Sequence, residues 1–124
     1  MFDLFDPLRV WSENWKKNLT KETVYIMFII NFNFIKSIEE VNTITEVHRE
    51  YVSKQYENDI FIIGGPKKPR DGGIVLAHSC SEKELRTILD NDPLILNEFA
   101  HYSLTEFNPM MATKKLDSYI NKLR

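Results

Sequence analysis

Segments typical of strands and of helices alternate along the middle of this chain, and their order restricts the fold more than any other feature. Runs of β-branched and aromatic residues predict strands, whereas capping boxes, in which a serine and a glutamate three residues later satisfy each other's backbone donors, predict helix starts. The predicted elements are a strand over 23–33, a helix over 37–58, strands over 59–64 and 73–79, a helix over 81–90 and a strand over 100–107. This βαββαβ order is typical of a ferredoxin-like α+β fold with an antiparallel sheet.

Two amphipathic helices are expected outside this βαββαβ unit. In residues 1–22, Asp6 before Pro7 is a favourable helix start, and apolar residues then recur at spacings of three or four. The same helical spacing of apolar residues recurs in residues 110–124. The sequence therefore predicts an N-terminal helical extension over 1–22, a domain over 23–109 and a C-terminal helix over 110–124.

One face of the predicted sheet needs a cover that the βαββαβ unit does not supply. The strand over 23–33 is almost continuously apolar, which predicts burial on both of its faces. Both helices of a ferredoxin-like fold pack on the same face of the sheet, so the other face is left open. A homodimer that pairs its sheets face to face is the favoured cover. The alternative is the helix over 1–22, which carries Trp11 and Trp15 on its apolar side.

Composition excludes several classes of partner. The net charge of −2 leaves no basic excess for a nucleic-acid backbone or an anionic membrane surface, and the longest apolar run, 24–30, is too short to cross a bilayer. Cys80 is the only cysteine, which excludes an internal disulfide, and neither His78 nor His101 shows metal-ligand spacing with Cys80 or with a second histidine. A cytoplasmic protein without a metal or another cofactor is expected, and the acidic residues that open the chain are unlike a secretory signal.

All four glycines of the chain lie within residues 64–73, between the second and third predicted strands. Glycine allows positive φ angles and close backbone approach, so this stretch predicts a hairpin loop. It is not a phosphate-binding loop, because the Gly-Lys-Ser/Thr ending is absent and a strand follows. The basic run from Lys67 to Arg70 is explained as a solvated tip, with the alternative that it steers an anionic ligand towards a nearby pocket.

His48 lies in the middle of an apolar helical stripe that also contains Val41 and Val52. A histidine at this position faces either the interior or a pocket, and spacing alone favours a core histidine with a hydrogen-bonded partner over a catalytic one. Asp92 before Pro93 is explained as the cap of a short helical turn. Nothing in the linear sequence brings His48 and Asp92 together.

Several short motifs, taken in order, resemble the YCII-related (YciI-like) family over about residues 23–109. The motifs are His48-Arg49-Glu50-Tyr51, Gly65-Pro66, Pro69-Arg70-Asp71-Gly72-Gly73, Asp92-Pro93, Tyr102 and Glu106-Phe107-Asn108-Pro109. The resemblance implies a dimeric α/β-barrel, formed by a homodimer that binds a small molecule. The sequence departs from the family in having Leu94 where phenylalanine is usual and Gly64 where a serine commonly precedes Gly-Pro.

The resemblance also implies a site. The family's proposed histidine and aspartate pair falls on His48 and Asp92, which would be the catalytic residues. Substrate-binding positions are then expected at Gly64, Gly65, Pro66, Arg49 and Tyr51. Of the glycine-rich stretch, only its first edge, Gly64-Gly65-Pro66, is a candidate pocket wall.

The implied activity is proton transfer of the lyase or isomerase type on a small cyclic or aromatic metabolite. The family includes an enzyme that eliminates chloride from a chlorinated hydroxyhydroquinone, and its fold is shared with muconolactone isomerases. His48 would act as general base or acid, with its tautomer set by Asp92. The alternative is a non-catalytic module that binds a small molecule or a protein partner through its terminal helices.

Overall fold

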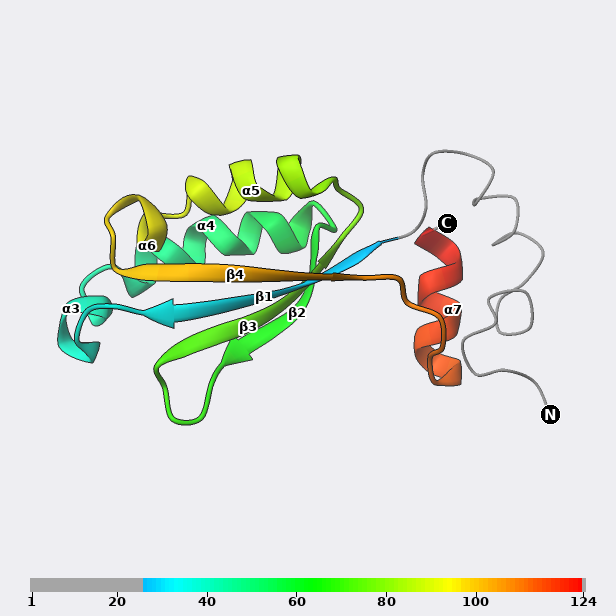
Figure 1. Cartoon of the computed structure of the whole chain (residues 1–124), viewed down its shortest axis with the longest axis horizontal. Helices are drawn as coiled ribbons and strands as arrows, with labels where there is room; N and C mark the ends of the chain where they lie inside the picture. The colour runs from blue at the N-terminus through cyan, green and yellow to red at the C-terminus, as the bar shows by residue number, and fades with distance from the viewer. Residues whose placement is uncertain (1–25, 124) are drawn as a thin grey trace. The chain divides into compact units, whose positions relative to one another are not determined.

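The computed structural model describes residues 26–123, with the elements labelled as in Figure 1. The amphipathic helix expected over 1–22, with Trp11 and Trp15, lies outside the described residues. The elements are β1 (Met27–Phe34), α3 (Ile38–Asn42), α4 (Thr45–Glu57), β2 (Phe61–Pro66), β3 (Gly72–His78), α5 (Glu82–Asp90), α6 (Pro93–Leu96), β4 (Ala100–Phe107) and α7 (Lys114–Leu123).

The four strands form one antiparallel sheet in the order β2-β3-β1-β4, which confirms the α+β fold expected from the sequence. The helices α4 and α5 lie on the same face of this sheet (Figure 1). Phe28, Ile30, Leu85 and Leu89 are fully buried between the two layers. Residues 28–106 make up one compact unit, and α7 belongs to a second one. A helix near the C-terminus is confirmed, but it begins at Lys114.

The prediction of one continuous helix over 37–58 is wrong, because the chain forms α3 and α4 with a break at Thr43 and Ile44. The Thr43 hydroxyl donates to the Glu40 carbonyl at 2.6 Å, and the backbone N–H groups of Thr43 and Ile44 donate three residues back rather than four. Side-chain hydroxyls that bond to nearby carbonyls compete with the helical ladder. The Ser37 capping box and the helix end at Asn58 match the prediction.

The hairpin between β2 and β3 is tighter than expected, since the strands extend to Pro66 and begin again at Gly72. None of the glycines, all of which the structure describes, has a positive φ. At Gly72 the requirement is close approach: a Cβ there would lie 1.8 Å from the carbonyl oxygen of Phe32. The hairpin is therefore held against β1, with the Phe34 N–H donating to the Asp71 carbonyl at 2.8 Å.

Candidate functional site

The structure brings His48 and Asp92 together, although 44 residues separate them in sequence. His48 lies in the first turns of α4, and Asp92 is the N-cap of α6. His48 Nδ1 and Asp92 Oδ1 are 2.8 Å apart, and the same carboxylate oxygen accepts the backbone N–H of Leu94 at 2.9 Å. Asp92 therefore caps a helix and orients a histidine at the same time.

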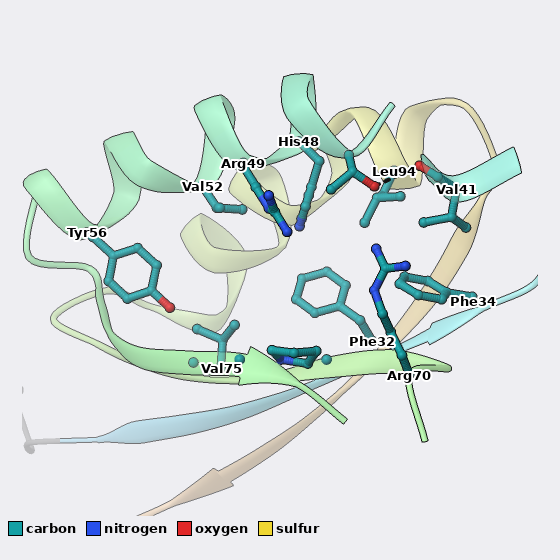
Figure 2. A pocket seen from close by; sticks show the side chains of 15 residues that line it. Phe32, Phe34, Val41, His48, Arg49, Val52, Tyr56, Arg70, Val75 and Leu94 are labelled. Carbon is teal, nitrogen blue, oxygen red and sulfur yellow. Dashed lines mark hydrogen bonds between the residues drawn. The ribbon is translucent and has the colours of Figure 1, made fainter. Parts of the chain in front are cut away.

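This contact determines which imidazole nitrogen is available to a ligand. The Asp92 side chain is 1 % exposed and that of His48 is 21 % exposed. An ionised carboxylate only accepts hydrogen bonds, so the proton of the shared hydrogen bond is assigned to His48 Nδ1. The other nitrogen, Nε2, is directed into the space between α4 and the sheet (Figure 2). In the neutral imidazole, Nε2 then has a free lone pair that can accept a proton.

A cavity of about 290 Å³ lies in front of His48. It is enclosed by helices on one side and by the β2–β3 hairpin and β1 on the other (Figure 2). Of the substrate-binding positions expected from the sequence, Arg49, Gly64, Gly65 and Pro66 line this cavity together with His48. The other lining residues are Phe32, Phe34, Val41, Thr45, Val52, Tyr56, Arg70, Gly73, Val75 and Leu94.

Tyr51, the last of the expected binding residues, is not part of the cavity lining and contacts α5 instead. Its hydroxyl donates to the Ile88 carbonyl of α5 at 2.6 Å, which ties α4 to α5. Burial, and to a lesser degree the charge of Asp92, raises the pKa of Tyr51, so its hydroxyl stays protonated at neutral pH. A substrate-binding role for Tyr51 stays a prediction.

Sequence reasoning did not find Tyr56 or Phe32, although both line the cavity. The Tyr56 hydroxyl points towards the sheet (Figure 2), and burial raises its pKa. A Cβ at Gly64 would lie 2.6 Å from this hydroxyl, so a glycine at position 64 leaves room for it. The Phe32 ring lies 6.2 Å from the His48 ring in an edge-on arrangement. Tyr56 lies two helical turns beyond His48, so helical spacing in the sequence could have identified it as a lining residue.

The basic run at the hairpin tip divides into residues with different roles. Lys67 Nζ donates to the side chains of Asn31 and Asn33 at 3.1 and 2.6 Å, and so holds the hairpin to β1. Lys68 is exposed. Arg70 lines the cavity, and its Nη1 donates to Asn42 Oδ1 at 2.9 Å.

Other reactive side chains have environments that oppose a chemical role. Burial raises the pKa of the Cys80 thiol to about 11, so the nucleophilic thiolate is scarce at neutral pH. His78 is fully buried, and burial lowers its pKa. Among residues 26–123 there is no group of three or more His, Cys, Asp or Glu placed to hold a metal ion. In that same range, no helix has the length and apolar character needed to cross a membrane.

Comparisons with known proteins agree with this architecture. A family model, the YCII-related domain, matches residues 20–108. No curated protein sequence matches the chain significantly. Among solved structures, the chain is similar to 5-chloro-2-hydroxyhydroquinone dehydrochlorinase from Burkholderia phenoliruptrix AC1100, in complex with 2,5-dihydroxybenzoquinone. That similarity has a TM-score of 0.57 and 17% sequence identity, over 64% of this chain and 90% of the other. SnoaB, a cofactor-independent oxygenase from Streptomyces nogalater, matches with a TM-score of 0.43 and 11% identity, over 73% of this chain and 97% of the other.

Proposed function

Because the chain belongs to the YCII-related domain family, we propose that it is a small-molecule enzyme that transfers protons on a cyclic or aromatic substrate, as a lyase or isomerase. The observation that carries this proposal is the 2.8 Å contact between His48 and the buried carboxylate of Asp92, at the edge of a largely apolar cavity. A histidine oriented by a carboxylate, with its second nitrogen free, is a common general base. We also propose a cytoplasmic setting, since Cys80 is the only cysteine.

The proposed reaction starts with a ring hydroxyl next to His48. Nε2 accepts the hydroxyl proton, and the electron pair of the O–H bond forms a carbonyl as ring electrons are displaced. These electrons form a C–H bond at another ring atom with the proton carried by His48, which completes an isomerisation. In a lyase that ring atom also carries a leaving group such as chloride, which then departs from the new sp³ carbon as a second ring hydroxyl loses its proton to His48 and becomes a carbonyl. The negative Asp92 carboxylate stabilises the imidazolium that exists between the two proton transfers.

The cavity restricts the size of the substrate. Its volume of about 290 Å³ is at the lower end of the range for ligand pockets, which favours a single ring with small substituents. Phe32, Val52 and Val75 form apolar walls that suit such a ring. A Cβ added at Gly65 would meet no heavy atom within 4 Å, so a ligand can approach this backbone closely.

The state of His48 can be tested directly by NMR of the ¹⁵N-labelled imidazoles. In the free protein we expect the Nδ1–H tautomer, since Nδ1 contacts Asp92. Titration with 2,5-dihydroxybenzoquinone is expected to shift the Nε2 resonance of His48. His101 is exposed on β4 and outside the cavity lining, so its resonances are the internal control. The proposed role would be contradicted if the imidazole resonances of His48 show the Nε2–H tautomer. It would also be contradicted if they do not shift while the ligand binds.

We further propose that the functional unit is a homodimer in which the open faces of two sheets meet. Val75 lines the cavity on the helix side of β3, so its neighbours Ile74 and Leu76 face away from the helices. Ile63 is paired with Leu76 across the β2–β3 hairpin and therefore shares that face. Ile63 is 62 % exposed and Ile74 is 38 % exposed, an apolar surface that a second copy would cover.

Light scattering tests the dimer. We expect a mass of about twice the 14.7 kDa of one chain at micromolar concentration. Replacing Ile63 by lysine is expected to shift the protein towards the monomer, because it places a charge in the proposed interface. The matched control is Val47→Lys, since Val47 is 54 % exposed on α4. A wild-type monomer would overturn the dimer and favour the helix over 1–22 as the cover.

A further inference from the structure

The charges that line the cavity are unbalanced. Two guanidinium groups, those of Arg49 and Arg70, belong to the lining, whereas no Asp or Glu does. Within residues 26–123, neither guanidinium lies within 4.0 Å of a carboxylate oxygen. The carboxylate of Asp92 is buried behind His48 and contacts its imidazole. The cavity therefore presents two uncompensated positive charges to a ligand.

Both arginines reach the cavity, and they come from different elements. Arg49 extends from α4 beside His48, and Arg70 extends from the β2–β3 loop, with both guanidinium ends in the space between the helix and the sheet (Figure 2). Arg70 is held in place by Asn42 at 2.9 Å and by the Phe34 ring, whose centroid is 5.9 Å from the guanidinium carbon. Asn42 is neutral and takes one of the five N–H donors of Arg70, so charge and donors remain for a ligand.

From this arrangement we infer that the cavity binds a single-ring hydroxy acid as its carboxylate anion, a substrate class that rests on the function proposed above. The ring lies between the apolar walls, the carboxylate accepts hydrogen bonds from Arg49 and Arg70, and a ring hydroxyl faces His48 Nε2. Guanidinium and carboxylate groups match in geometry and form paired hydrogen bonds.

A carboxylate fits the cavity better than a phosphate ester does. Phosphate sites in proteins are commonly built from the free backbone N–H groups of a helix N-terminus or a glycine-rich loop. Here Gly64 and Gly65 belong to the extended strand β2 and pair with Val75 and Ile74 of β3, so they do not form the turn of successive free N–H groups that such a site uses. The anion-binding groups that remain in the lining are the side chains of Arg49 and Arg70.

Calorimetry on the full-length protein with matched probes tests this inference. We expect 2,5-dihydroxybenzoate to bind at least about tenfold more tightly than 2,5-dihydroxybenzamide, which has the same ring without the charge. Arg70→Gln and Arg49→Gln should each weaken binding of the acid about tenfold and leave binding of the amide within about twofold. Arg70→Lys keeps the charge but loses the planar fork, so an intermediate loss is expected.

Lys68→Gln is the matched control for charge. It removes a positive charge from the same loop, outside the cavity lining, so binding of the acid should change by less than about twofold. The inference is overturned if the acid fails to bind at millimolar concentration, if the amide or phenyl phosphate binds as tightly, or if Lys68→Gln matches the loss seen with Arg70→Gln. Far-UV circular dichroism of each variant checks that it is folded.

The outcome is separable from that of the proposed function, because binding is measured without turnover. Selective binding of the acid combined with a His48 that does not respond to it would support the anion site and contradict the acid–base role. Turnover of neutral rings that depends on His48 but not on Arg49 or Arg70 would contradict the anion site and leave the acid–base role intact.

Discussion

Replacing His48 by glutamine is expected to lower kcat by about 10²–10⁴-fold, the usual contribution of a positioned general base. Glutamine can still donate an N–H to Asp92 Oδ1, so Asp92 keeps this partner as well as its capping bond from the Leu94 N–H, while the proton-accepting nitrogen is lost. KM should change little, because the walls of the cavity and both arginines are unaltered. The measurement is steady-state kinetics on a ring substrate that the wild-type protein turns over.

His101→Gln is the control for this prediction, since His101 is exposed on β4 and outside the lining of the cavity. Its kinetics should equal those of the wild type. Asp92→Asn should also lower kcat, because an amide N–H aimed at His48 Nδ1 favours the opposite tautomer. It should lower stability as well, since the buried Oδ1 also accepts the Leu94 N–H. Equal kcat values for wild type and His48→Gln would exclude His48 as the base.

Much of the fold could be predicted because it is encoded locally. The capping boxes at Ser37 and Ser81 and the Asp92-Pro93 helix start depend on residues at most three apart, and each is present in the structure. The break at Thr43 was missed because the apolar stripe continues through it: Val41 and Ile44 both pack in the cluster with Leu94 and Ala100. Periodicity identifies the buried face but not a local competition for backbone carbonyls.

The site could be predicted only in part, since it is assembled from elements that are distant in sequence. The apolar stripe placed His48 on the inner face of its helix, but its 2.8 Å contact with Asp92 depends on how α4 and α6 pack. The role of Arg70 is harder still to derive, because Lys67 in the same basic run is turned to β1 whereas Arg70 lines the cavity. The sequence shows that the run from Lys67 to Arg70 is basic. Only the path of the hairpin backbone determines which of these side chains lines the cavity.

The path of the β2–β3 hairpin depends on Gly72. Gly72→Ala is expected to lower the free energy of unfolding by about 3 kcal/mol or more. An added Cβ would lie 1.8 Å from the Phe32 carbonyl oxygen and 2.8 Å from its carbon. Both atoms belong to the backbone of β1, a central strand, so they cannot move without disturbing the pairing of the sheet. Urea unfolding, followed by circular dichroism at one fixed protein concentration, measures the change.

Gly65→Ala is the matched control, because the same methyl group would meet no heavy atom within 4 Å and the φ angle is not positive. It should leave stability unchanged or raise it by about 0.4–1 kcal/mol, through the lower entropy of the unfolded chain. Comparable losses for both variants would mean that glycine is needed along the whole hairpin for flexibility rather than at Gly72 for close approach. If the two variants differ as expected, the contact between Gly72 and Phe32 holds the hairpin against β1. The same contact then fixes where Arg70 and the Gly64-Gly65-Pro66 wall stand relative to His48.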